Sequence, residues 1–276
     1  METDLVASGD ARQSRQAARQ RAITEAVMKA GAIRIEELAE RFEISQMTVH
    51  RDLDELEARG LLRKSRGIAT ALSTALVESS DVYRAGRQLV EKEAIAQAAL
   101  DFIEPGQAII LDDSTTTLHL LPHLRAKKPL TVITNTLTVM EQLRATSGIT
   151  LVGLGGQYYN WCSAFMGRMT VNALSALRAD TLVMSTSAIT DDICFHQTLE
   201  TVDVKRAMFD SASTRLLLVD HTKFEKRALH AMVALSEFDA VIVDAGTDRS
   251  HVERLRDAGV NVVVAGRRPV ASRDNG

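Results

Sequence analysis

Short apolar runs alternate with amphipathic helical segments over most of the chain, from residue 91 to residue 266. Strands that are apolar throughout are buried on both faces, and consecutive parallel strands need a crossover helix between them. The alternation therefore predicts a doubly wound, mostly parallel α/β domain over residues 91–270. We expect its strands at 107–113, 130–135, 149–156, 180–186, 215–220, 239–244 and 260–266, and its helices at 91–103, 118–124, 137–143 and 202–212.

The first seventy residues have a different pattern, three short helical segments followed by a basic hairpin. We expect the helices at 17–30, 33–42 and 46–60. Ser45 is placed to cap the third helix, after a tight turn. Residues 61–72 alternate apolar and basic side chains around Gly67, which indicates a two-stranded wing. Together these elements predict a winged helix-turn-helix DNA-binding domain over residues 17–72.

The charge pattern supports a DNA-contacting face on this domain. Residues 11–70 contain 12 Lys and Arg against 9 Asp and Glu, whereas the whole chain has a net charge of −3. Side chains at the start of the third helix can reach base edges in a major groove, and cations on the wing can neutralise phosphates. The expected DNA-binding residues are Ser45, Gln46, Thr48, His50, Arg51, Arg63, Lys64 and Arg66. The alternative is a three-helix bundle whose charges are only solvated.

Polar residues gather where the predicted strands of the second domain end. Ligands of open parallel sheets bind at the carboxyl ends of the strands. Hydroxyl groups and free backbone N–H groups at a strand-to-helix turn can hold an anion. We call the ligand of this pocket the effector. The residues expected to bind it are Asp112, Ser114, Thr115, Thr116, Thr134, Asn135, Gly155, Gly156, Lys205, Asp220 and Lys223. Each could instead be a helix cap or a turn residue, so the set argues for a pocket more strongly than any member does.

Both domains resemble the DeoR family of sugar-operon repressors. In the first domain the resemblance lies in 44–53 (ISQMTVHRDL) and 60–63 (GLLR). In the second it lies in the blocks 111–116, 132–135, 155–156, 204–208 and 219–224. The resemblance implies a homo-oligomeric repressor, a dimer or a tetramer, of a carbohydrate-catabolic operon. It further implies that a phosphorylated sugar or polyol releases the protein from double-stranded operator DNA, and that the sensor domain is related in fold to ribose-5-phosphate isomerase.

Some residues depart from the pattern of that family. His50 stands where an Arg is usual, and Ser114 stands where a Gly is usual. Residues 185–188 (STSA) replace a glycine-rich segment. Because Ser114 and 185–188 lie around the expected pocket, the effector need not be a common hexose phosphate.

An enzyme is the main alternative function. Asp191, Asp192, Glu200 and Lys205 offer the acid, base and cation that a phosphosugar isomerase needs. The segment between Asp192 and Lys205 lacks a glycine-rich turn to wrap a substrate, and a fused DNA-binding module favours sensing over turnover. We therefore expect no enzymatic activity.

We expect neither a metal nor another cofactor. His119 and His123 are four residues apart, but Pro122 intervenes and no Cys or carboxylate is spaced to complete a site. Trp161 suits either stacking on a sugar ring or packing at a subunit interface, and we favour the interface.

The remaining features concern the ends, the linker and the compartment. We expect a disordered tail at 1–16 and a linker at 73–90. Two cysteines, Cys162 and Cys194, cannot form a disulfide framework. No apolar run approaches the about 18 residues of a membrane span, and the start of the chain lacks the apolar core of a signal peptide. A cytoplasmic location is the expectation.

Overall fold

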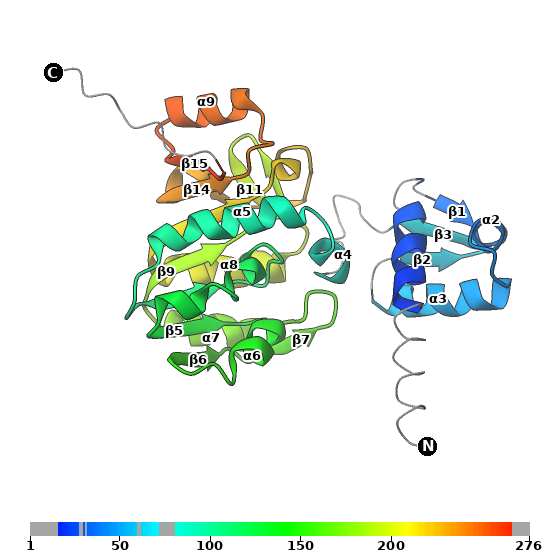
Figure 1. Cartoon of the computed structure of the whole chain (residues 1–276), viewed down its shortest axis with the longest axis horizontal. Coiled ribbons are helices and arrows are strands. Elements are labelled where there is room, and N and C mark those ends of the chain that lie inside the picture. Colours follow the sequence, from blue (N-terminus) through cyan, green and yellow to red (C-terminus); the bar gives the residue numbers. More distant parts are fainter. Residues whose placement is uncertain (1–15, 28–29, 31, 60–61, 72–80, 267–276) are drawn as a thin grey trace. The chain divides into compact units, whose positions relative to one another are not determined.

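The computed structural model (Figure 1) describes residues 16–27, 30, 32–59, 62–71 and 81–266, and it divides the chain into two compact units, residues 1–84 and 85–276. Residues 1–15 of the expected tail, the expected cap Gly31, the expected helix end Gly60 and residues 73–80 of the expected linker lie outside the described residues. So does the basic segment 267–276.

The N-terminal unit is a winged helix-turn-helix. Residues 16–27 are helical, and α2 (Ile35–Arg41) and α3 (Gln46–Ala58) follow. Ser45 caps α3 as expected, because its Oγ accepts a hydrogen bond from the backbone N–H of Thr48 at 3.2 Å. Val49, Leu53 and Leu56 on the inner face of α3 are buried against the other elements.

The wing contains one strand more than we expected. Its sheet has the order β1-β3-β2, formed by β1 (Ala32–Arg34), β3 (Ile68–Ala71) and β2 (Leu62–Ser65). The prediction of a helix beginning at residue 33 was therefore wrong. Ile33 is buried between two exposed neighbours, a period of two that belongs to a strand, and it pairs with Ala69 of β3. The turn between β2 and β3 has two residues with positive φ, Arg66 at 48° and Gly67 at 76°.

The C-terminal unit has a seven-stranded parallel sheet of order β15-β14-β12-β9-β4-β5-β6. All seven strands occur where the sequence predicted them. They are β4 (Ala108–Leu111), β5 (Leu130–Thr134), β6 (Ile149–Gly153), β9 (Ala179–Met184), β12 (Ala212–Val219), β14 (Ala240–Val243) and β15 (Val262–Val264).

Alternate residues of the apolar strands point to opposite sides of this sheet, so both of its faces are apolar. Helices cover both faces. Figure 1 shows α5 (Leu89–Ala99) lying across one face, where its buried Ile95 and Ala99 share a core with Ile109 and Leu111 of β4. The same core includes side chains of α6 (Leu137–Leu143). The opposite core contains Ile110 of β4 with side chains of α7 (Arg168–Ser175), α8 (Leu199–Asp210) and α9 (Arg249–Asp257).

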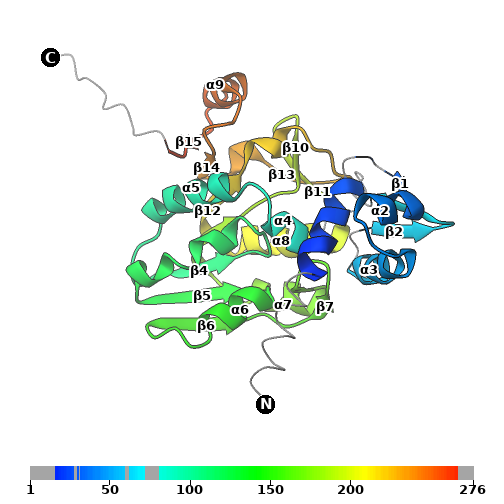
Figure 2. The same ribbon diagram turned by 45° about the vertical axis from the view of Figure 1, so that its right-hand side comes forward.

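Several smaller elements were not predicted. A second sheet of order β10-β11-β13 is antiparallel, and Figure 2 shows its three strands close together. Its strands are β10 (Ala188–Thr190), β11 (Ile193–His196) and β13 (His230–Ala234), and a separate hairpin joins β7 (Gln157–Tyr159) to β8 (Ala164–Met166). The short helix α4 (Asp81–Ala85) lies within the expected linker, and α7 and α9 were also missed.

Segment 118–124 is not the regular helix we expected. The 3-10 helix η2 (Thr117–Leu120) ends before Pro122, and η3 (Leu124–Lys127) begins after it, because proline has no N–H with which to continue a helix. Three further 3-10 turns are η1 (Leu100–Phe102), η4 (His221–Phe224) and η5 (Leu235–Glu237). Among the described residues, no helix is long and apolar enough to cross a membrane.

Candidate functional site

The parallel register places the carboxyl ends of the central strands side by side. Leu111 at the end of β4 is level with Thr134 of β5 and with Val183 of β9. Thr134 in turn pairs with Gly153 of β6, and Val219 of β12 pairs with Val243 of β14. The loops that follow these residues form one continuous edge, which we call the strand-end edge.

An ion-paired cluster of three buried side chains lies at the centre of this edge. Lys205 of α8 donates to the Asp112 carboxylate, and its Nζ lies 3.2 Å from Oδ1 of Asp113. The backbone N–H of Ser185, just after β9, donates at 2.8 Å to Asp112 Oδ2, the same carboxylate oxygen that Lys205 contacts. Burial by itself would lower the pKa of Lys205, but the two carboxylates outweigh it, so the pKa is raised and the ammonium form is retained.

The hydroxyl-rich loop after β4 is held by hydrogen bonds within the loop. Asp112 Oδ1 accepts from the backbone N–H of Ser114 and from the Thr117 hydroxyl, both at 3.0 Å. Ser114 Oγ accepts from the backbone N–H of Thr117 at 3.2 Å. Ser114 and Thr117 are therefore committed to the loop itself, whereas Thr115 accepts a hydrogen bond from Lys92 Nζ at 3.0 Å. Thr116 is buried beside them.

Asn135 offers an acceptor at the adjacent strand end. Its Nδ2 donates to the carbonyl of Phe165 at 2.9 Å, but its Oδ1 is buried and has no hydrogen-bond partner among the described residues. Thr134 is internally satisfied, since its hydroxyl accepts from the backbone N–H of Thr136. A buried amide oxygen without a donor is costly, so Asn135 is suited to accept from a ligand hydroxyl.

In the glycine pair after β6, Gly156 is packed so closely that a side chain would not fit. A Cβ at this position would lie 2.6 Å from the carbonyl oxygen of Met166 and would overlap the Thr170 hydroxyl. A Cβ at Gly155 would meet nothing within 4 Å, and the Gly155 carbonyl accepts from Thr170 Oγ1 at 2.8 Å. Of the two, Gly155 is the one that leaves room for a ligand.

A second charged cluster forms around Asp220, after β12. Burial would raise the pKa of Asp220, but Lys223, the Thr222 hydrogen bond, Lys226 and Lys92 outweigh it, so its pKa is lowered. Asp220, Lys223 and Lys92 are all buried. The strand-end edge thus has one part with two carboxylates around a lysine, at Lys205, and another with lysines around one carboxylate, at Asp220.

Two residues of the edge were missed from the sequence, Asp113 and Lys92. Asp113 immediately follows Asp112 and shares its lysine. The signal for Lys92 was available: it lies on the inward stripe of α5 with Ile95, Ala96 and Ala99, where an unpaired lysine would be costly.

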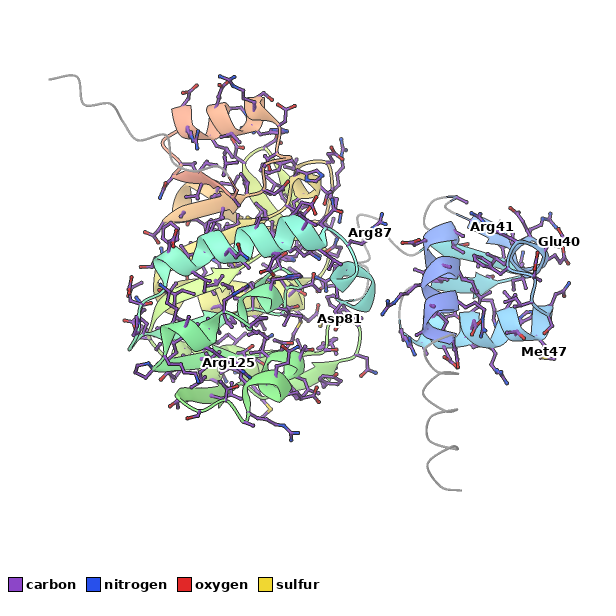
Figure 3. All side chains as sticks on the ribbon, in the orientation of Figure 1. Glu40, Arg41, Met47, Asp81, Arg87 and Arg125 are labelled. Atoms are coloured by element: carbon purple, nitrogen blue, oxygen red, sulfur yellow. The ribbon has the colours of Figure 1, made fainter. Side chains whose placement is uncertain are left out.

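The predicted DNA-contacting residues lie on the surface of the N-terminal unit. Gln46 and Arg51 of α3 are exposed, Thr48 and His50 are half-buried, and Met47 is 77% exposed and projects outward in Figure 3. Ser45 is exposed and also caps the helix. Arg63 and Arg66 on the wing are exposed, which suits contacts to phosphates.

Lys64 and Arg19 have partners within the unit. Lys64 pairs with Asp54 of α3, and its backbone N–H donates to Glu57 at 2.9 Å, so it ties the wing to α3. Arg19 Nε donates to the buried Asp52 at 2.5 Å, which raises the pKa of the guanidinium. Arg19 therefore fastens the first helix to α3 and does not extend the basic face.

The residues considered for catalysis do not form one site. Asp191 and Asp192 line a surface cavity of about 510 Å³, where Asp192 pairs with Arg254. Glu200 lines a different cavity of about 420 Å³ between α7 and α8. Lys205 lines neither cavity and pairs at the strand-end edge.

The histidines and cysteines have ordinary structural surroundings. His119 and His123 both contact Glu93, at 3.3 and 2.6 Å. Within the described part of the chain, no group of three or more His, Cys, Asp or Glu side chains is arranged so that it could hold a metal ion. Cys162 and Cys194 are both buried, and they form no disulfide. Burial raises the pKa of Cys194 to about 12, against the opposing effects of Thr186 and Lys205, so its thiol is not nucleophilic near neutral pH. Trp161 is half-buried and packs against the core.

Comparison with known proteins agrees with this arrangement. Residues 19–75 match the DeoR-like helix-turn-helix domain, and residues 87–245 match the DeoR C-terminal sensor domain. The uncharacterized HTH-type transcriptional regulator YgbI of Escherichia coli is 30% identical over 90% of this chain and 97% of its own length.

Two further relatives are named repressors. The transcriptional repressor AccR of Agrobacterium fabrum is 30% identical over 86% of this chain and 92% of its own length. The lactose phosphotransferase system repressor of Staphylococcus aureus is 33% identical over 85% of this chain and 94% of its own length. The chain, with a helix-turn-helix unit followed by a sensor unit, belongs to the DeoR family of transcriptional regulators.

Proposed function

We propose that this protein is a transcriptional repressor of a carbohydrate-catabolic operon, released from its operator DNA by a phosphorylated sugar or a related metabolite. The observation that carries the proposal is the pairing of an exposed, basic helix-turn-helix with a buried, charged strand-end edge in one chain. The relative named as a lactose phosphotransferase system repressor points to the same class of operon.

The N-terminal unit reads the DNA. Base edges in the major groove are contacted by side chains at the start of α3, namely Gln46, His50 and Arg51. Thr48 lies beside them on the same helix. Arg63 and Arg66 of the wing bind flanking phosphates, a contribution that weakens as salt rises. Lys64 contributes less, because its charge is already paired with Asp54.

The strand-end edge binds the effector in a defined orientation. The phosphate group of the effector lies toward Thr115, Thr116 and Lys223, in the part of the edge where lysines outnumber carboxylates. Its hydroxyl groups lie toward Asp112, Lys205 and Asn135, which offer carboxylate oxygens and the unsatisfied amide oxygen. Gly155 leaves backbone room beside them.

The protein acts as an even-numbered homo-oligomer in the cytoplasm, where bacterial DNA is located. Two-fold operators match pairs of identical helix-turn-helix units. We propose that it senses its ligand without converting it, because the carboxylates considered for catalysis lie apart from Lys205.

The test begins with a duplex selected from random sequences by the full-length protein. A thermal-shift screen of phosphorylated sugars, polyols and sugar acids identifies ligands, and fluorescence anisotropy measures release of the duplex. We expect at least one phosphorylated compound both to stabilise the protein and to release the DNA. Failure to select any duplex would contradict the proposal, as would turnover of ribose 5-phosphate that Lys205→Ala abolishes.

A further inference from the structure

The first turn of α5 brings a buried lysine to the strand-end edge. Gln88 is the N-cap residue of this helix, and its carbonyl accepts from the backbone N–H of Lys92 at 2.9 Å. Leu89 and Val90 of the same turn are exposed, whereas Lys92 is only 3% exposed. The turn therefore directs its cation inward and leaves its apolar side chains outside.

Contacts from this turn reach the loops after two strands directly, and the loop after a third strand through His221. Lys92 Nζ donates to Thr115 Oγ1, in the loop after β4. Lys92 also acts electrostatically on Asp220, in the loop after β12. Gln88 Nε2 lies 3.5 Å from Nε2 of His221, whose Nδ1 lies 3.0 Å from Asp244 after β14. This helical turn is thus linked to the loops after β4 and β12, and through His221 to the loop after β14.

The backbone at the start of the turn is strained. Gln88 has φ 51° and ψ 44°, the left-handed region that a residue with a Cβ rarely adopts. Such a conformation persists only where surrounding contacts impose it, and here the first hydrogen bond of α5 and the His221 contact hold it. Residues 81–88, which include α4 and this strained position, lead directly from one unit of the chain to the other.

We propose that Lys92 binds the phosphate group of the effector together with Thr115 and Lys223, and that the first turn of α5 transmits this binding to residues 81–88. The inference rests on the proposed function and adds to it a ligand-binding residue and a route of coupling. A phosphate monoester carries a charge of about −1.5 to −2 at neutral pH. Such an anion draws Lys92 away from its present partners, Thr115 and Asp220. The backbone of the first turn follows, because the side chain is buried and packed. The contact between Gln88 and His221 then changes. The backbone at the start of α5 therefore has different conformations with and without the bound ligand.

Binding is tested with inorganic phosphate as the probe, by isothermal titration of the full-length protein without DNA. We expect Lys92→Met to raise the Kd for phosphate at least tenfold. Lys127→Met, the same chemical change on η3 of the same unit, should leave the Kd within about twofold. If Lys92→Met fails to fold, Lys92→Gln keeps a hydrogen-bond donor without the charge and should show the same loss. Absence of phosphate binding in the wild type, or equal affinity in the Lys92 variants, would overturn the assignment.

Transmission is tested by hydrogen exchange of the same protein with and without phosphate. We expect phosphate to change exchange in peptides covering 81–92 and not in peptides covering α7. Gln88→Ala should keep phosphate affinity within about twofold but lose the response at 81–87. An unchanged response in Gln88→Ala, or no response in the wild type at saturating phosphate, would overturn the proposed route. Because these measurements use no DNA, they can fail while operator binding succeeds, and the reverse also holds.

Discussion

The two units of this protein use charge in opposite ways. The cations proposed for DNA contact, such as Arg51 and Arg63, are exposed, whereas Asp112 and Lys205 of the strand-end edge are 0% and 2% exposed. Exposed charges are screened by salt and cost little to keep unpaired. Buried charges must have partners, and removing one partner leaves the other uncompensated. The DNA-reading unit should therefore tolerate loss of one of these exposed cations with its fold intact, whereas the sensor unit should not tolerate loss of a buried one.

The largest effect should follow from removing the buried lysine. Lys205→Met leaves Asp112 and Asp113 together without a cation, so we expect a loss of about 3–5 kcal/mol in the free energy of unfolding of the sensor unit, measured with urea. Arg249→Ala, which breaks an exposed pair with Glu253, is the control and should leave unfolding unchanged. Adding Asp113→Asn to Lys205→Met should restore part of the loss. If Lys205→Met alone is as stable as the wild type, the proposed difference between the two units is wrong.

On the DNA-reading unit the corresponding change should affect binding and not folding. Arg51→Ala should weaken binding to a selected operator by about ten- to a hundredfold, through loss of a base or phosphate contact, with an unchanged melting temperature. Anisotropy and thermal unfolding measure the two effects separately. Unchanged affinity at moderate salt would exclude the start of α3 as the recognition surface.

The wing allows a finer comparison between two neighbouring cations. Arg63 is exposed, and Lys64 is paired with Asp54. Arg63→Ala should lower the slope of log affinity against log salt by about 1, since one phosphate contact is lost. Lys64→Ala should lower it by less. Equal changes in slope would show that the Lys64–Asp54 pair opens when DNA binds.

The smallest effect concerns acid stability at the strand-end edge. The pKa of Asp220 is lowered in the folded protein. The contribution of Asp220 to folding stability is therefore fully present above its unfolded pKa of about 3.9, and it is lost as pH falls through the folded pKa. Between about pH 4 and pH 3 the wild type should lose more stability than Asp220→Asn, which cannot titrate. Urea midpoints at these two pH values measure the difference. Parallel losses in both proteins would mean that Asp220 is not held as a carboxylate by its lysines.

The fold followed closely from sequence patterns wherever burial dictated them. Apolar runs such as 108–111 are buried on both faces, so their composition identified them as parallel strands. β1 was missed because the strand that contains Ile33 ends at Arg34 and α2 begins at the next residue, Ile35, without an intervening turn. β10 and β11 were missed because their hairpin turns on two aspartates with positive φ, Asp191 and Asp192, without a glycine.

The candidate site was less accessible from sequence than the fold. Proximity to strand ends was enough to select Asp112 and Thr115, since position along a strand is readable. The pairing of Lys205 with both Asp112 and Asp113 spans about ninety residues of chain and depends on how α8 packs. Lys92 precedes the first strand of the sheet and reaches the edge only because α5 crosses that face. Such long-range contacts leave no local signal beyond a lysine at a core position.

Release of the operator by an effector requires that DNA and effector oppose each other on one chain. Thermodynamic linkage makes this opposition reciprocal, so the factor by which effector weakens operator binding must equal the factor by which operator weakens effector binding. The direct measurement is the Kd of a phosphorylated sugar identified by the thermal-shift screen, determined by isothermal titration with and without saturating selected duplex. We predict weaker effector binding on the duplex, by the same factor that anisotropy gives for DNA release. An effector Kd that is the same with and without DNA would contradict the proposal that the effector releases this protein from its operator.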